Sequence, residues 1–159
     1  LTTDRVKLAM EKVNLSELST HVVAELLSAA QAKHIDLKLS SPKSITIKAN
    51  EESIGILLHN LIRNAINYTQ EGGQILVNIK ASKNSALLSV TDNGPGIDAD
   101  KRAIVLNRFQ KAGNSPKSGS GLGLAIVKRI CDLHYTSLQL STPTGGSPLP
   151  SARLKVRFI

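Results

Sequence analysis

The sequence has no tryptophan, and aromatic residues make up only 3% of its 159 residues. The hydrophobic fraction of 41% is that of an ordinary globular protein. Because so few of these residues are aromatic, the core has to be built almost entirely from aliphatic side chains. A single cysteine, Cys131, excludes an internal disulfide and gives no metal-site spacing. It lies in an apolar helical run, where we expect a plain core residue in a reducing compartment. No apolar run approaches the roughly 20 residues that cross a bilayer, and no signal peptide is visible.

Acidic residues are nearly missing from residue 101 onward. This part contains ten Lys and Arg residues but one acid, Asp132, whereas residues 1–100 are close to neutral. Such a one-sided excess attracts polyanions, whether nucleic acid, a membrane surface or the phosphates of a nucleotide. Charge alone does not choose among these ligands. The scarcity of aromatic side chains for base stacking argues against nucleic acid.

The order of predicted elements is that of an α/β (α+β) two-layer sandwich, in which helices cover one face of a mixed sheet. Apolar periodicity and capping residues predict helices over residues 16–30, 50–69, 98–106 and 122–133, with Ser16 and Asn50 as the first two N-caps. Alternation predicts strands over residues 13–15, 35–39, 45–47, 75–79, 87–91, 138–140 and 154–158. Strands 35–39 and 45–47 are expected to form a hairpin or close pair. Residues 107–120 lack periodicity and are predicted to form a loop.

The beginning of the chain predicts a fragment of a longer protein. The first residue is Leu1 rather than Met, and residues 1–12 have the pattern of a helix end. We therefore expect residues 1–12 to be the tail of a preceding domain or a linker, and residues 13–159 to form one domain.

Glycines follow a carboxylate at the end of one predicted strand. The segment Asp92–Ile97 (DNGPGI) comes directly after a buried run. A carboxylate beside backbone without side-chain bulk suits a flat ligand that carries an exocyclic amine, such as adenine. A second cluster, Gly119–Leu124 (GSGLGL), opens a helix. Taken alone, each cluster is more often a tight turn than a nucleotide site, and the P-loop pattern does not occur.

A stripe of three amides lies on the predicted helix 50–69. Asn60, Asn64 and Asn67 are spaced i, i+4 and i+7, so they fall within about 60° of one another, and apolar residues occupy the other side. Asn is a mediocre helix former, which makes three in register unusual. The stripe is either a solvated helix face or a set of amides that meet a divalent cation and phosphate oxygens.

These segments, in this order, resemble the ATP-binding catalytic domain of sensor histidine kinases, a branch of the Bergerat-fold (GHKL) ATPases. Within that branch the similarity is to bacterial membrane-bound kinases of the QseC and PmrB type. Residues His59–Thr69 are similar to the N box of the family, Asp92–Ile97 to its G1 box, Phe109 to its F box and Gly119–Leu124 to its G2 box. The resemblance covers nearly the whole chain from Val13. It implies an ATP-binding catalytic domain over residues 13–159 with an ATP lid at about 107–121.

The resemblance implies ATP and Mg²⁺ as ligands, with Asp92 accepting from the adenine amine and Asn64 and Asn60 as the metal residues. The implied nucleotide-binding residues are Asn60, Asn64, Asn67, Tyr68, Asp92, Gly94, Gly96, Ile97, Phe109, Gly119, Ser120, Gly121, Leu122, Gly123 and Leu124. The implied catalytic residues are Asn60, Asn64, Arg108 and Lys111. The family often has Lys or Arg in place of Asn67, and the segment before Phe109 lacks the usual acid. Lys111 or Lys117 is then the expected source of the missing positive charge.

The implied activity is transfer of the γ-phosphate of ATP to a His on a separate dimerisation domain, from which it passes to an Asp of a response regulator. None of the four histidines has the His-acid-x-x-Thr-Pro context of that acceptor, so we expect the acceptor outside this chain. Asn60 stands where ATP-hydrolysing relatives have Glu, which implies very slow hydrolysis. The resemblance also implies that the whole protein is a membrane-bound homodimer whose catalytic part lies on the cytoplasmic side of the bacterial inner membrane. This chain is then expected to be a soluble fragment that binds no nucleic acid.

Two alternatives remain open. One is a regulatory ATPase or protein-serine kinase of the same fold. The other is a nucleic-acid-binding module that depends on the basic residues beyond residue 100.

Overall fold

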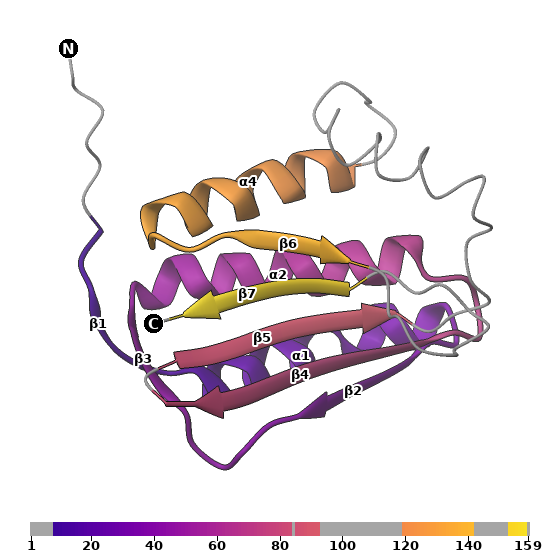
Figure 1. Cartoon of the computed structure of the whole chain (residues 1–159). Helices are drawn as coiled ribbons and strands as arrows, with labels where there is room; N and C mark the ends of the chain where they lie inside the picture. The colour runs from indigo at the N-terminus through magenta and orange to yellow at the C-terminus, as the bar shows by residue number, and fades with distance from the viewer. Residues whose placement is uncertain (1–7, 84, 93–118, 142–152, 159) are drawn as a thin grey trace.

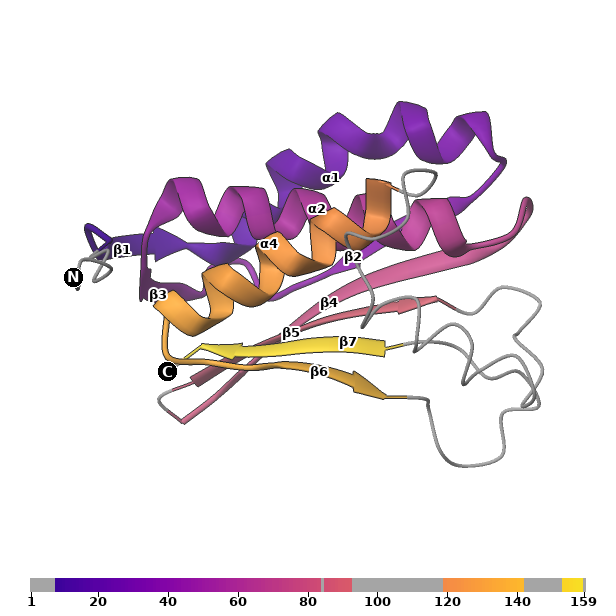
Figure 2. The same cartoon turned by 90° about the horizontal axis from the view of Figure 1, so that it is seen from above.

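A five-stranded mixed sheet forms one layer of the computed structural model, and the three helices that the structure describes cover one of its faces (Figures 1 and 2). The structure describes residues 8–83, 85–92, 119–141 and 153–158. The described elements are β1 (Glu11–Asn14), α1 (Leu15–Ala32), β2 (Asp36–Ser40), β3 (Thr46–Ala49), α2 (Glu51–Tyr68), β4 (Gln74–Ser82), β5 (Ser85–Asp92), α4 (Gly119–Leu133), β6 (Leu138–Ser141) and β7 (Arg153–Phe158). The predicted two-layer α/β sandwich is confirmed.

The sheet has the strand order β2-β4-β5-β7-β6, with β2 and β4 parallel and the other neighbours antiparallel. The predicted pairing of strands 35–39 and 45–47 is wrong. Strand β2 pairs with β4, where Leu37 lies opposite Ile75, and β3 pairs with β1 in a separate two-stranded sheet, where Ile47 lies opposite Val13. Alternation identifies a strand but not its partner, and the α2 crossover brings β4 alongside β2 in the parallel direction.

The core lies between the sheet and the helices, and α2 is at its centre. Helix α2 packs against α1 on one side and α4 on the other, and it also contacts β4 and β5. Its core side chains are completely buried, and they are Ile54, Leu57, Leu58, Leu61 and Ile62. Apolar side chains of β4 and β5 alternate toward this face, which is why one aliphatic layer suffices without tryptophan.

Cys131 lies on the buried face of α4 and is 1% exposed. Burial, with a smaller contribution from the negative charge of Asp132, raises the pKa of its thiol to about 11. A thiol with such a pKa is protonated at neutral pH and a poor nucleophile. The prediction of a plain core cysteine is confirmed.

Several helix ends differ from their predictions. The N-cap of α1 is Asn14, not Ser16, because Asn14 Oδ1 accepts from the backbone N–H of Glu17 at 3.0 Å. Ser16 instead is buried and accepts a hydrogen bond from Ser41 Oγ at 2.8 Å. Residues 11 and 12, expected at the end of a helix, belong to β1. Helix α4 begins at Gly119 rather than near residue 122, so the second glycine cluster lies inside its first turns.

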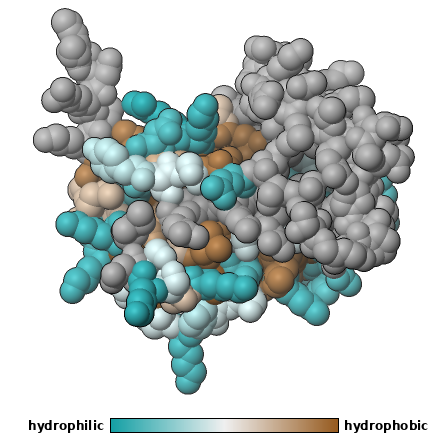
Figure 3. Space-filling model, viewed as in Figure 1, coloured by the Kyte–Doolittle hydropathy of each residue, from teal (hydrophilic) through white to brown (hydrophobic). Residues whose placement is uncertain are grey.

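The described surface shown in Figure 3 carries hydrophobic side chains in patches that polar side chains interrupt. Among the described residues, the large apolar ones that are exposed are scattered over different helices, strands and connections, and they are Met10, Leu27, Ile56, Leu76, Ile126 and Tyr135. Among the described helices, none has the length and hydropathy of a membrane-crossing segment.

Candidate nucleotide site on helices α2 and α4

Helix α2 carries the amide stripe, and its start is fixed by its N-cap. Asn50 Oδ1 accepts from the Ser53 N–H at 2.9 Å, and Glu51 and Glu52 place negative charge in the first turn, where the helix dipole favours it. This N-cap was predicted from the sequence and is confirmed. The helix then runs to Tyr68, the last residue before the C-cap Thr69.

The three amides of the stripe differ in burial. Asn64 is 3% exposed, Asn60 is half-buried and Asn67 is exposed. The Oδ1 atom of Asn64 is buried and has no hydrogen-bond partner among the residues that the structure describes. An unpaired buried carbonyl oxygen costs about 1–3 kcal/mol, which makes this oxygen a candidate for contact with a ligand. This atom separates the two interpretations of the stripe, because a solvated face does not bury its amides.

Asn60 is held by its own helix and by the close approach of α4. Its Nδ2 donates to the Ile56 carbonyl oxygen at 2.8 Å. A Cβ atom added to Gly123 of α4 would lie 2.9 Å from Asn60 Oδ1, which is shorter than the contacts that Cβ atoms make in proteins. Glycine at position 123 therefore lets α4 lie directly against the amide stripe. This places the second glycine cluster, Gly119–Leu124, beside the segment His59–Thr69 that resembles the N box.

Asp92 is the last residue of β5, as the sequence predicted, and its side chain is half-buried. It lies opposite Ile75 in the ladder with β4 and takes part in a polar interaction. Figures 1 and 2 show the C-terminal ends of β5 and α2 and the N-terminal end of α4 at the same end of the molecule. The elements that carry three of the predicted motifs thus have these ends on the same side of the molecule, although they are far apart in the sequence.

The other predicted site residues are placed unequally. Tyr68 ends α2 and is half-buried, and it has a polar partner. Leu124 of α4 is in the hydrophobic core. Gly119, Ser120, Gly121 and Leu122 form the first turn of α4. Gly94, Gly96, Ile97, Arg108, Phe109, Lys111 and Lys117 lie outside the described residues, as do the predicted helix 98–106 and the predicted loop 107–120 apart from its last two residues.

The donor set near α2 fits Mg²⁺ held together with phosphates. Among the described residues there is no group of three or more His, Cys, Asp or Glu side chains that could hold a metal by itself. Mg²⁺ prefers oxygen ligands, keeps several waters and usually takes few protein atoms alongside substrate phosphates. The unpaired Asn64 Oδ1 is an oxygen of the required kind, with Asn60 Oδ1 one turn away.

Two residues that bond to the helices of this site, Lys33 at the end of α2 and His134 at the opposite end of α4, were not predicted from the sequence. Lys33, at the C-cap of α1, donates from Nζ to the Ile66, Asn67 and Thr69 carbonyl oxygens at 2.9, 3.3 and 2.7 Å. His134 bridges the end of α4 to the start of α2. Both contacts join residues distant in the sequence, and no local pattern marks them.

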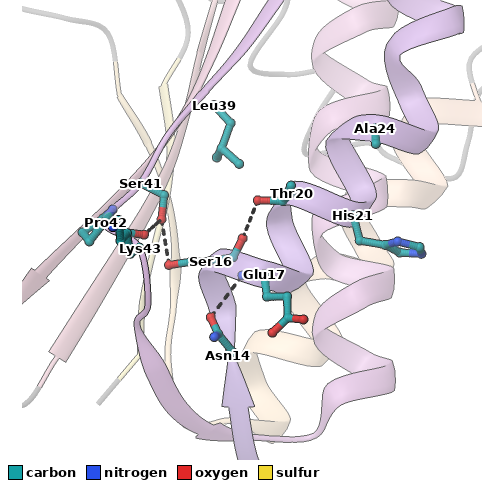
Figure 4. Close-up of a pocket in the computed structure, with 10 residues that line it drawn as sticks. All are labelled: Asn14, Ser16, Glu17, Thr20, His21, Ala24, Leu39, Ser41, Pro42 and Lys43. Atoms are coloured by element: carbon teal, nitrogen blue, oxygen red, sulfur yellow. Dashed lines mark hydrogen bonds between the residues drawn. The ribbon is translucent and has the colours of Figure 1, made fainter.

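A hollow of about 730 Å³ lies elsewhere, between the first half of α1 and the connection from β2 to β3 (Figure 4). Its polar side chains bond to the protein itself: Ser41 to Ser16, and Thr20 to the Ser16 carbonyl oxygen at 2.8 Å. None of the predicted site residues that the structure describes lines it. We therefore do not assign the nucleotide to this hollow.

Comparisons with known proteins agree with this arrangement. Residues 49–156 match the family described as histidine kinase-, DNA gyrase B-, and HSP90-like ATPase. The chain is 36% identical over 138 residues to the sensor protein kinase PmrB of Pseudomonas aeruginosa, which covers 86% of this chain and 29% of that protein. It therefore spans less than a third of the length of PmrB.

Solved structures have the same fold. The catalytic domain of histidine kinase ThkA superposes with a TM-score of 0.76 at 22% identity, over 95% of both chains. Full-length ShkA in complex with AMPPNP gives a TM-score of 0.73 at 28% identity, over 96% of this chain and 31% of that one. The likeness to the predicted type of domain is thus found in both sequence and structure.

Proposed function

The chain belongs to the family of histidine kinase-, DNA gyrase B- and HSP90-like ATPases, and from this we propose that it binds MgATP between α2, α4 and the end of β5. Its similarity to the catalytic domain of sensor histidine kinases supports a role as the ATP-binding catalytic part of such a kinase. The observation that carries the proposal is Asn64, whose buried Oδ1 has no hydrogen-bond partner in the described part of the chain and which lies on the helix that α4 touches. The complex of ShkA with AMPPNP, an ATP analogue, supports an adenine nucleotide as the ligand.

The chemistry that we propose is phosphoryl transfer. The bond between the γ-phosphorus and the bridging oxygen of ATP breaks, and ADP leaves. A bond forms from phosphorus to the unprotonated imidazole nitrogen of the acceptor, and the other ring nitrogen gives up its proton to solvent. Bound Mg²⁺ supplies neutralisation of the phosphate charge. The residues of this chain supply placement: Asp92 for the adenine amine, Asn64 and Asn60 for the ion and phosphates, and the α4 N-terminus for phosphate oxygens.

We propose that the acceptor histidine belongs to a separate dimerisation domain and that a response regulator takes the phosphoryl group from it. A membrane-bound homodimer is proposed for the whole protein. Asn60, an amide at the position of a general base in ATP-hydrolysing relatives, is unable to take a proton from water. We therefore expect hydrolysis by this domain alone to be very slow.

A thermal-shift experiment with MgATP, ATP in EDTA, and DNA tests the proposal. A ligand at a hundredfold excess over its Kd stabilises by about 2.7 kcal/mol, which raises the Tm of a domain of this size by about 5–11 °C. We expect that rise with MgATP, a smaller one in EDTA and none with DNA. A shift with DNA alone would overturn the proposal in favour of the nucleic-acid module.

The variant Asn64→Leu makes the test specific. Because leucine removes an unpaired buried oxygen, the ligand-free variant should lose no more than about 1 kcal/mol of stability. The extra stabilisation by Mg²⁺ should disappear. Asn78→Leu, at a half-buried amide of β4, is the matched control and should keep the full nucleotide response. An unchanged Mg²⁺ dependence in Asn64→Leu would show that this oxygen does not face the ion.

A further inference from the structure

His134 joins two helices that also carry the proposed nucleotide site. Its Nδ1 lies 2.8 Å from the Ile130 carbonyl oxygen, and its Nε2 lies 3.1 Å from the backbone nitrogen of Asn50. A carbonyl oxygen only accepts and a backbone N–H only donates. The imidazole is therefore neutral, with its proton on Nδ1, and it ties the end of α4 to the residue that caps α2.

Asn50 extends this contact to the segment that enters the domain. Its Oδ1 accepts from the Ser53 N–H and Oγ at 2.9 and 2.7 Å, while its Nδ2 donates to the Ala9 carbonyl oxygen at 2.9 Å. The backbone of Asn50 serves His134 at the same time. One residue thus holds the incoming chain, the first turn of α2 and the end of α4.

This cluster and the proposed site lie at opposite ends of the same helices. Figures 1 and 2 show β1, the start of α2 and the end of α4 together at one end, away from the ends of β5 and α2. Helix α4 has 15 residues, which corresponds to about 22 Å. A helix of this length moves as a rigid element, so a displacement at His134 reaches Gly123 and, through their contact, Asn60.

We infer that His134 is a positioning residue that couples the segment around Ala9 to the nucleotide site through Asn50 and α4. The inference rests on the proposed function and adds to it a route between two ends of the domain. Coupling of this kind is reciprocal. If the placement of the incoming segment affects nucleotide binding, nucleotide binding also changes the mobility of that segment.

The second half of this reciprocity is measurable on the present chain. A spin label is attached at Met10→Cys, a position that is 38% exposed next to Ala9, while the buried Cys131 stays unlabelled in the folded protein. MgADP should reduce the mobility of this label. A label at Leu27→Cys on α1, which is also 38% exposed, is the control and should not respond.

Three variants locate the route. His134→Leu removes both hydrogen bonds and should abolish the response of the label. His134→Gln keeps an acceptor for the Asn50 N–H and should restore at least part of it. Asn50→Asp keeps the capping oxygen but loses the donor to Ala9, so it should abolish the response although the helix remains capped. If His134→Leu does not fold, Asn50→Asp carries the test.

The outcomes separate this inference from the proposed function. Calorimetry on the unlabelled chain first establishes whether MgADP binds. Binding without any response at Met10→Cys, or a response that persists in Asn50→Asp and His134→Leu, would overturn the coupling but leave nucleotide binding intact. If MgADP does not bind at all, the proposed function fails and the coupling fails with it.

Discussion

Replacing Lys33 by Met should destabilise the protein far more than an ordinary surface lysine does. Lys33 Nζ donates to three carbonyl oxygens at the end of α2, those of Ile66, Asn67 and Thr69. Helix α2 has no basic residue in its own last turn. The ammonium group from α1 therefore supplies the positive charge that favours a helix C-terminus, and it satisfies carbonyl groups that have no partner within the helix.

The magnitude follows from charge, geometry and exposure. A hydrogen bond to a charged group contributes about 1.5–3 kcal/mol, and the helix end adds about 0.3–1 kcal/mol. The three bonds share one ammonium group and do not add, and Lys33 is only half-buried. Methionine keeps the apolar part of the side chain. We expect Lys33→Met to lower the free energy of unfolding by about 2 kcal/mol, or the Tm by about 4–8 °C.

Urea denaturation measures this loss, and Lys38→Met is the matched control. Lys38 Nζ lies 3.5 Å from Asp36 Oδ2, with the two side chains 72% and 50% exposed, and such pairs contribute at most about 1 kcal/mol. Hydrogen exchange should also become faster in the last turn of α2 for Lys33→Met alone. A loss in Lys33→Met no larger than in Lys38→Met would refute the role assigned to these three bonds.

Three further predictions concern helix packing and helix ends. Gly123→Ala should weaken nucleotide binding, measured by calorimetry, because its Cβ displaces Asn60; the control Gly55→Ala, whose nearest contact would be 3.9 Å away, should leave affinity unchanged. Equal affinities in the two variants would contradict the contact. Because burial raises the pKa of Cys131 from 9.0 to about 11, folding retains a proton that the unfolded chain releases. Stability in urea melts should therefore fall between about pH 9 and 11, less steeply in Cys131→Ala, and identical slopes would refute the shift. Tyr135 is 93% exposed and has φ 56, so Tyr135→Gly should raise stability by about 0.5–1 kcal/mol, whereas a loss would show that the side chain contributes.

The sequence was most informative where a local pattern determines the structure. Helix α2 was predicted within a residue at each end, because Asn50 caps it and its apolar spacing fits one buried face. The position of Asp92 at the end of β5 followed from a buried run before a glycine-rich segment. The roles of the site residues stay predictions.

Other features depend on contacts that no local pattern encodes. The partner of β2 is decided by a crossover that returns the chain at β4, so alternation alone gave the wrong pairing. Asn14 rather than Ser16 caps α1, because Ser16 is engaged by Ser41 across the fold. Lys33 and His134 bind backbone groups more than 30 residues away.

The parallel pairing of β2 with β4 also sets an order of assembly. Residues 36–40 find their partner at residues 74–78, after α2 has been made. During synthesis, a chain that ends within α2 leaves β2 without a neighbour in its sheet. Contacts this far apart in sequence slow folding. The β2 edge of the sheet therefore forms only after residue 74 has been made, and a pause of the ribosome before that residue would prolong the exposure of an unpaired strand.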